Sequence, residues 1–205
     1  MTIKLPGKNL RSSHFPPLKR IIPEFDVVLL GNGAGQWGTS LLAKIMHWRN
    51  EQLVIDADAI AHAPLARLRT SILTPHAAEY TRLLTSHKLT PQGLIAILGS
   101  NTLLLKGRED HILTSGETYK NTTGHAAMTV AGTGDILAGL CAGLYAQSKD
   151  PARAACAASY ILGHTGMSLA SHLGCGMIAS DLLRALPNHL LHARIWESTA
   201  ALHKQ

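Results

Sequence analysis

Aromatic residues are scarce in this chain, which holds three tryptophans, four tyrosines and two phenylalanines among its 205 residues. Proteins that bind single-stranded nucleic acid stack its bases on aromatic side chains, so the scarcity argues against such a partner. The basic residues give a formal net charge of +6, but they are scattered and form no dense run. We therefore expect no nucleic-acid partner, because a small anionic substrate suits this mild positive charge better.

Cysteine is scarce as well, and Cys141, Cys156 and Cys175 form no C-x-x-C pair. This spacing excludes a disulfide framework and is typical of a reducing compartment. The first 20 residues are polar and interrupted by prolines, unlike a secretory signal or a membrane-spanning helix. These features predict a cytoplasmic protein with no membrane partner, in which Cys156 packs as a small hydrophobic residue.

Charged residues make up only 16% of the chain and hydrophobic residues 46%, which argues against disorder. The length suits one domain, residues 1–205, with a sizeable core. Apolar runs alternate with helix-like segments, which predicts an α/β fold with a mainly parallel sheet. Residues 191–205 fit either a docked helix or a loose tail. The expected strands are 26–31, 51–58, 70–75 and 101–107, with a hairpin of 110–115 and 117–122; the expected helices are 39–48, 76–84, 90–98, 135–147, 151–170 and 177–186.

A glycine-rich turn follows the first expected strand. In VVLLGNGAGQWG, Gly33, Gly35 and Gly38 fit the pattern G-x-G-x-x-G, and Asp56 or Asp58 follows about 20 residues later. This arrangement is typical of a Rossmann dinucleotide-binding unit. Glycine turns between strand and helix also occur throughout α/β proteins, because glycine lets the backbone approach a ligand or neighbour closely. The turn alone leaves both interpretations open.

A second glycine turn, Gly132-Thr133-Gly134-Asp135, stands directly before an apolar helix. Backbone N–H groups and the partial positive charge of a helix N-terminus make such a turn a natural phosphate site. An ionised Asp135 beside it is placed to take a proton from a hydroxyl during phosphoryl transfer. The alternative is that Asp135 only begins the helix. Further along this helix, the four-residue spacing of Gly139 and Gly143 predicts close helix packing.

Two shorter stretches also carry candidate residues. In LTPHAAEYTRL, Thr74 is expected to cap a helix that starts at Pro75. His76 then falls in the first turn, near the sheet edge where α/β proteins bind ligands, while Glu79 is expected in solvent or paired with Arg82. In LLLKGRED, Lys106 ends a strand in a place suited to a phosphate. The alternatives are that His76 is an incidental histidine on a surface helix and that Lys106 is an ordinary lysine at a strand end.

Together these stretches resemble the ADP/ATP-dependent NAD(P)H-hydrate dehydratase family. The similarity is carried by L-T-P-H-x-x-E-x-x-R-L, then L-L-K-G, then A-G-T-G-D-I-L-A-G. In addition, D-V-V-L-L-G-N-G-A-G matches the family's G-P-G-L-G turn, and V-I-D-A-D-A-I matches its D-A-D-A-L segment. The resemblance implies a ribokinase-like three-layer sandwich, with a mainly parallel central sheet flanked by helices.

The resemblance also implies an activity and a site. ADP or ATP phosphorylates the hydroxyl of the S-epimer of hydrated NAD(P)H, and elimination of phosphate regenerates NAD(P)H. Asp135 is implied as the catalytic base, and Mg²⁺ would accompany the nucleotide, with no ligand residue assigned. The implied substrate-binding residues are Gly35, His76 and Asp135; the implied nucleotide-binding residues are Lys106, Gly107, Arg108, Glu109, Asp110, Gly132, Thr133 and Gly134.

One departure from the family bears on assembly. Compared with the family, we expect the strand-helix region that begins its domain to be missing here, which would leave a sheet edge open and predicts a homo-oligomer. Three alternatives remain. They are a small-molecule kinase resembling hydroxyethylthiazole kinase, a nucleotide-binding relative without activity, and a Rossmann dehydrogenase. His189 and His192 have no third ligand nearby in the sequence, so a metal site is not expected there.

Overall fold

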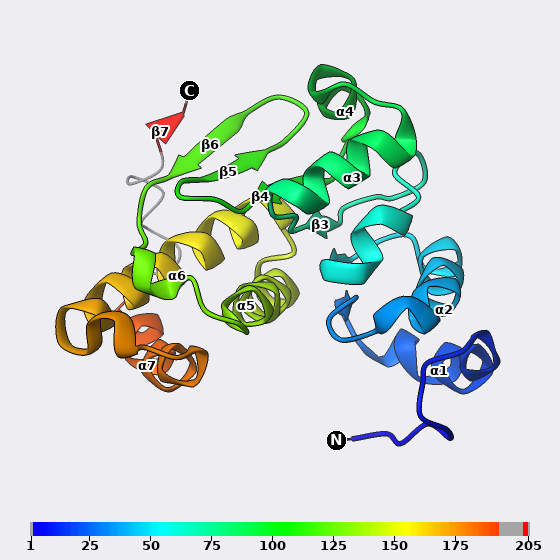
Figure 1. The fold of residues 1–205 in the computed structure, drawn as a ribbon. Coiled ribbons are helices and arrows are strands. Elements are labelled where there is room, and N and C mark those ends of the chain that lie inside the picture. The colour runs from blue at the N-terminus through cyan, green and yellow to red at the C-terminus, as the bar shows by residue number, and fades with distance from the viewer. Residues whose placement is uncertain (1, 193–202, 205) are drawn as a thin grey trace.

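A computed structural model describes residues 2–192 and 203–204 of the chain. The described strands form one mixed sheet in chain order (Figure 1). The first four pair in parallel, and the next three add on as antiparallel neighbours. The strands are β1 (Val28–Leu30), β2 (Leu53–Ile55), β3 (Ile72–Leu73), β4 (Thr102–Leu105), β5 (Asp110–Leu113), β6 (Thr118–Asn121) and β7 (His203–Lys204).

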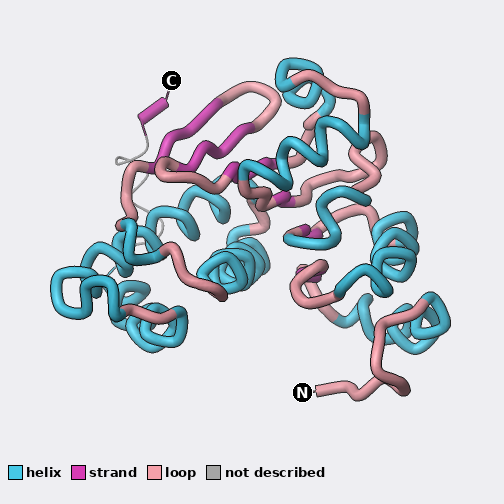
Figure 2. Tube along the Cα trace, in the orientation of Figure 1, coloured by secondary structure: helices cyan, strands magenta, loops and turns pink. Residues whose placement is uncertain are grey.

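Helices cover both faces of the sheet (Figure 2). On one face lie α1 (Phe15–Ile21), α2 (Gly35–Trp48), α3 (Ala77–His87) and α4 (Pro91–Ile97); on the other lie α5 (Thr133–Ser148), α6 (Pro151–Leu173) and α7 (Ala179–His192). Short 3-10 turns occur at Ser12–His14, Ile22–Glu24, Ala57–His62 (η3), Ala126–Met128 and Gly174–Gly176. The predicted α/β three-layer sandwich is confirmed.

The two layers follow from the two-residue period of the strands. Leu53 and Ile55 of β2 pack in the core beside α2 and α3, while Val54 between them packs in the core beside α5 and α6. The same alternation separates Leu73 from Ile72. Because successive strand side chains point to opposite faces, each short apolar strand supplies both hydrophobic cores.

Most expected elements are confirmed, with changes at their ends. Helix α2 begins at Gly35 rather than at residue 39, because the glycine turn itself enters the helix. The prediction for Gly139 and Gly143 was wrong, since a Cβ added at either position meets no atom within 4 Å. The question of a docked helix or loose tail falls mostly on residues 193–202, which lie outside the described residues. No helix among the described residues is long and apolar enough to cross a membrane.

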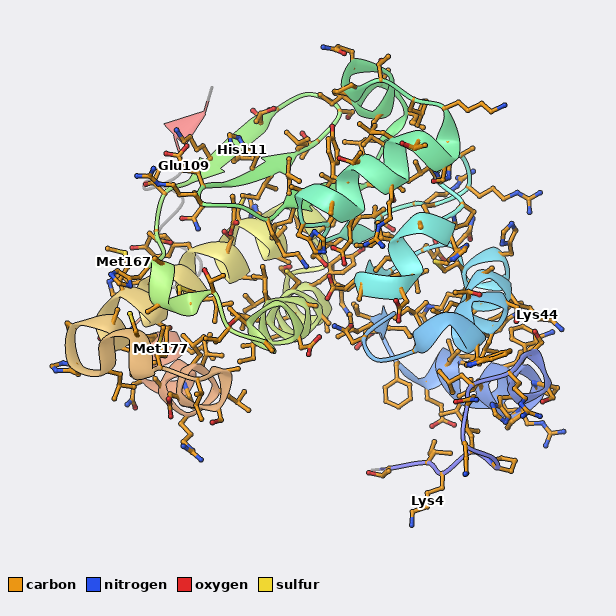
Figure 3. All side chains as sticks on the ribbon, in the orientation of Figure 1. Lys4, Lys44, Glu109, His111, Met167 and Met177 are labelled. Carbon is orange, nitrogen blue, oxygen red and sulfur yellow. The ribbon has the colours of Figure 1, made fainter. Side chains whose placement is uncertain are left out.

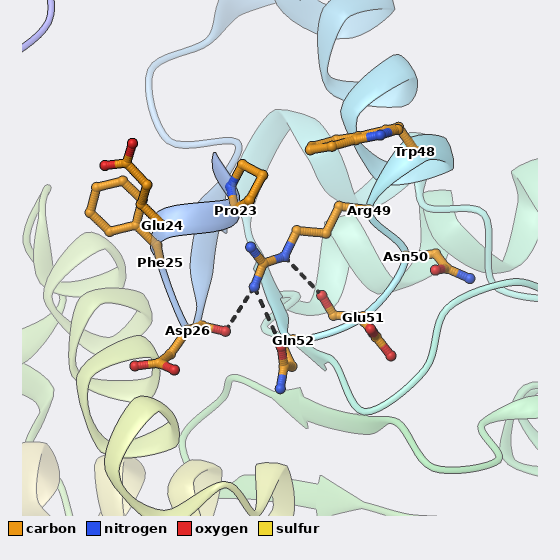
Figure 4. Close-up of a pocket in the computed structure, with 9 residues that line it drawn as sticks. All are labelled: Pro23, Glu24, Phe25, Asp26, Trp48, Arg49, Asn50, Glu51 and Gln52. Atoms are coloured by element: carbon orange, nitrogen blue, oxygen red, sulfur yellow. Dashed lines mark hydrogen bonds between the residues drawn. The ribbon is translucent and has the colours of Figure 1, made fainter. Parts of the chain in front are cut away.

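A pocket of about 450 Å³ lies at the amino ends of β1 and β2 (Figure 4). The Arg49 guanidinium fills its base and donates hydrogen bonds to the carbonyl oxygens of Ile22 and Asp26, each at 2.8 Å. The same guanidinium also reaches the Gln52 side chain at 3.4 Å. Arg49 therefore links the segment that precedes β1 to the segment that precedes β2, at the amino ends of both strands.

The three cysteines are free, and they differ in accessibility. Burial raises the pKa of Cys156 to about 12 and also raises that of the fully buried Cys141, whereas Cys175 is exposed. Only a thiolate reacts with a disulfide reagent. We expect the native protein to consume one equivalent of dithionitrobenzoate quickly, at Cys175, and the denatured protein three. Fast reaction of a second thiol, or of a Cys175→Ser variant, would contradict this assignment.

Candidate active site

The carboxyl ends of the four parallel strands bring a polar cluster together. Asn32 follows β1, Asp56 follows β2, Thr74 follows β3 and Lys106 follows β4. Parallel pairing aligns these ends, as Leu30 lies opposite Ile55 and Ile55 opposite Leu73. Ligands of open α/β sheets bind at this edge, so the cluster is the candidate active site.

A buried ion pair forms the base of this site. The side chain of Asp56 is only 3% exposed. Its Oδ1 lies 2.8 Å from Nζ of Lys106 and accepts a second hydrogen bond, also of 2.8 Å, from the Thr74 hydroxyl. Glu79 lies farther from the same ammonium, at 3.9 Å. A carboxylate this deeply buried requires such partners, so Asp56 holds Lys106 at the sheet edge.

The N-terminus of α5 faces this pair. Gly132 caps the helix in a left-handed conformation, with φ of +96°. A Cβ added at Gly134 would lie 3.6 Å from Nζ of Lys106, which places the ammonium against the first turn. The first N–H groups of a helix lack intrahelical acceptors and carry partial positive charge. Lys106 and this turn together form an anion-binding surface.

Asp135 stands exposed in the same first turn of α5. Nδ2 of Asn32 donates hydrogen bonds to Oδ1 of Asp135 at 2.5 Å and to Oδ2 of Asp56 at 2.8 Å. The Asn32 amide therefore links Asp56 to Asp135, which lies 103 positions after Asn32 in the sequence. An accessible carboxylate beside an anion-binding surface can accept a proton while a phosphoryl group is held next to it.

The first glycine turn is shaped by close backbone approach. Gly31 has φ of +120°, and a Cβ there would lie 1.8 Å from the carbonyl oxygen of Asp56, so no side chain fits. Gly35, with φ of +63°, donates its N–H to Asp58 at 2.8 Å. Both acidic candidates of the Rossmann interpretation are thus engaged within the protein. The turn instead places Asn32 between two carboxylates.

The structure corrects the predictions for the start of α3. His76 is the N-cap rather than a first-turn residue, and its Nδ1 accepts the N–H of Ala78 at 3.1 Å. Thr74 does not cap the helix, because its hydroxyl binds Asp56. Glu79 is buried rather than solvated, and its Oε2 accepts the His76 N–H at 2.8 Å. Sequence pattern does not reveal this reciprocal cap, in which the His76 side chain bonds the first turn of its own helix.

The segment from Lys106 to Asp110 divides into two parts. Lys106 faces α5, and its backbone pairs with His76. Glu109 forms a 2.6 Å ion pair with Lys120, whose hydrogen bond lowers the pKa of Glu109. Figure 3 shows Glu109 and His111 beside the β5–β6 hairpin. Asp110 accepts hydrogen bonds from Ser159 Oγ at 2.7 Å and Gly107 N at 3.0 Å.

Burial raises the pKa of Asp110, with these hydrogen bonds opposing the effect. The structure thus brings Lys106, Gly132, Thr133, Gly134 and Asp135 together around one turn, with His76 and Gly35 at the ends of neighbouring elements. The carboxylates of Glu109 and Asp110 point into internal contacts instead. At Glu109 and Asp110, backbone groups are therefore better candidates for ligand contacts than the side chains.

No group of three or more metal-binding side chains occurs in the described ranges. His189 meets His164, with 3.3 Å between their Nδ1 atoms. Mg²⁺ commonly keeps several waters and binds through substrate phosphates with few protein carboxylates. The residues present fit a magnesium ion that enters with nucleotide phosphates, and not one held by the protein alone.

Comparison with known proteins gives a consistent result. The model of a family described as NAD(P)H-hydrate dehydratase matches residues 3–188. A bifunctional NAD(P)H-hydrate repair enzyme of Pyrobaculum aerophilum is 35% identical over 202 residues, covering 91% of this chain and 40% of that enzyme. An ADP-dependent (S)-NAD(P)H-hydrate dehydratase of Natrialba magadii is 32% identical over 165 residues, covering 79% of this chain and 62% of that enzyme.

The chain thus spans less than two thirds of the length of either relative. Among solved structures, a ribokinase-like superfamily protein of Enterococcus faecalis V583 superimposes with a TM-score of 0.74 at 27% identity. That alignment covers 88% of this chain and 68% of the other. The expected ribokinase-like architecture is confirmed.

Proposed function

Because the chain belongs to the NAD(P)H-hydrate dehydratase family, we propose that it repairs hydrated NAD(P)H with ADP or ATP. The observation that carries the proposal is the meeting of Lys106, the Gly132–Gly134 turn and Asp135 at the N-terminus of α5. A phosphoryl group bound to this turn lies beside both a cation and a carboxylate. Phosphoryl transfer to a hydroxyl depends on such positioning and charge compensation.

The proposed first step transfers the terminal phosphoryl group. Asp135 takes the proton of the substrate hydroxyl, whose oxygen forms a bond to the terminal phosphorus while the bond from phosphorus to the departing nucleotide breaks. Lys106 and the N–H groups of the Gly132–Gly134 turn offset the charge on the phosphoryl oxygens. In the second step the C–O bond breaks and phosphate leaves with its electrons. Loss of a proton from the neighbouring carbon restores the ring double bond.

We assign binding roles by place in the site. The hydrated dinucleotide contacts Gly35, His76 and Asp135, and the transferred phosphate is held by Gly132, Thr133 and Gly134. The adenine nucleotide contacts Lys106 and the backbone from Gly107 through Arg108 and Glu109 to Asp110. Support comes from the position of His76 and Lys106 on neighbouring chain segments at the sheet edge. Mg²⁺ bound to the phosphates would lower their negative charge, and we assign it no side-chain ligand.

The test is recovery of dihydronicotinamide absorbance when purified protein is mixed with hydrated NADH, Mg²⁺ and either ADP or ATP. Omission of nucleotide is the control. We expect recovery only with nucleotide, accompanied by release of one phosphate for each dihydronicotinamide formed. A stable phosphorylated product without recovery would instead identify a small-molecule kinase. Nucleotide binding with no product would identify an inactive relative.

We also propose a homo-oligomer in the cytoplasm. The three free cysteines are typical of a reducing compartment. Phe25, which is 47% exposed, precedes β1, the first strand in the sheet order, and Trp37, which is 64% exposed, lies near the start of α2, the helix that follows β1. Association would shield such apolar groups from water. Small-angle scattering is expected to give a mass above 21.9 kDa, and a strict monomer would contradict the proposal.

A further inference from the structure

The Asn32 side chain lies between two carboxylates that play different parts in the site. Asp56 is buried and bound to Lys106, whereas Asp135 is exposed on α5. The Asn32 amide nitrogen has two hydrogens and donates one bond to each carboxylate, at 2.8 Å and 2.5 Å. Among the described residues, no other side-chain hydrogen bond or ion pair joins Asp135 to the strand ends.

The orientation of this amide is set by its neighbours. Rotating it by half a turn would put its oxygen against two carboxylates, each of which only accepts hydrogen bonds when ionised. In the observed orientation Oδ1 is buried and has no hydrogen-bond partner in the described part of the chain. An unsatisfied buried acceptor is unfavourable. Bridging the two carboxylates is the interaction that offsets it.

The backbone also directs Asn32 into this place. Gly31 presses against the carbonyl of Asp56 so closely that no side chain fits at position 31. This contact places the turn directly beside the carboxyl end of β2. The next residue, Asn32, can therefore reach the Asp56 side chain. Asp56 is bound to Lys106 and Thr74 at the sheet edge. Asn32 thereby links this buried group to the Asp135 carboxylate on α5.

We propose that Asn32 is a positioning residue, which holds the Asp135 carboxylate toward the reacting hydroxyl by linking it to the Asp56–Lys106 pair. This inference rests on the proposed function, in which Asp135 is the base. A carboxylate exposed on a first helical turn otherwise has several accessible rotamers. Misplacement of a reacting group by about 1 Å is enough to lower the rate of a chemical step about 100-fold.

The test compares Asn32→Leu, which keeps the branched shape of the side chain but has no donor, with Asn32→Ser, whose short hydroxyl cannot span both carboxylates. We expect kcat to fall about 10- to 100-fold for each, with KM for ADP changed less than about twofold. In an Asp135→Asn background, Asn32→Leu should lower kcat no further, because residues acting as one unit are not additive. Asn50→Leu is the matched control, since the Asn50 amide donates to the Arg67 carbonyl at the other end of β2.

A melting-temperature cycle of Asn32→Leu, Asp135→Ala and the double variant tests the bridge without reference to turnover. We expect the double variant to lose less melting temperature than the sum of the losses in the two single variants. Additive losses, or an unchanged kcat in both Asn32 variants, would overturn the inference while leaving the repair reaction intact. A wild-type protein without repair activity would refute the proposed function, and the melting cycle would still decide whether Asn32 couples to Asp135.

Discussion

Replacing Asp135 with Asn is expected to lower kcat for dihydronicotinamide recovery by about 10²- to 10⁴-fold, the usual effect of removing a general base. The substitution keeps the size of the side chain and removes its charge, and with it the ability to take the hydroxyl proton. KM for ADP should change little, because Lys106 and the Gly132–Gly134 backbone remain. Initial rates over a range of ADP and hydrated NADH concentrations measure both quantities.

The fold should tolerate this substitution, because Asp135 is exposed. A carboxylate in a first helical turn contributes about 0.3–1 kcal/mol through the helix dipole. The matched control is Asp150→Asn, which makes the same chemical change at the N-cap of α6, beside the far end of α5. That variant should keep wild-type turnover, since Asn is also a good N-cap. Retention of more than a tenth of wild-type kcat by Asp135→Asn would remove Asp135 from the role of base.

The architecture is largely predictable from local sequence pattern. Each of the four parallel strands is a short, mainly apolar run between turn residues, and the helices that follow them have polar or glycine residues near their ends. These signals need no knowledge of distant residues. The positions of Lys106 at a strand end and Asp135 at a helix start follow from the same local reasoning. The parallel sheet then brings both to one edge, as the structure shows.

The partners within the site are not predictable in this way. Asp56 and Asp58 are equivalent in the sequence, yet Asp56 binds Lys106 and Asp58 binds the Gly35 N–H. Which carboxylate is buried depends on the pairing of β2 and β4 with β3, which lies between them, and not on any one segment alone. Asn32 could be recognised only after α5 is placed, because its contact with Asp135 spans 103 positions. Helical spacing predicts Glu79 in solvent or paired with Arg82, because the spacing does not show that His76 caps that helix.

Replacing Lys106 with Met is expected to reduce both stability and activity. Asp56 is almost fully buried, and loss of the ammonium at 2.8 Å leaves its charge without a counterion. Removing one partner of a buried ion pair commonly costs about 3–5 kcal/mol. We expect about 3 kcal/mol here, because Thr74 and Asn32 still donate to the carboxylate. Urea unfolding followed by circular dichroism measures the loss.

The double variant Lys106→Met/Asp56→Asn separates the two roles of the lysine. With Asp56 neutralised, the nearest buried charge no longer lacks a counterion, and Glu79, 3.9 Å from the ammonium, still accepts the His76 N–H. Most of the lost stability should therefore return. Nucleotide affinity and kcat should stay low, because the cation facing the Gly132–Gly134 turn is still missing. Lys120→Met, which breaks the partly exposed pair with Glu109, should leave stability almost unchanged. Recovery of activity together with stability in the double variant would mean that Lys106 serves only to neutralise Asp56, and that phosphate binding rests on the helix terminus alone.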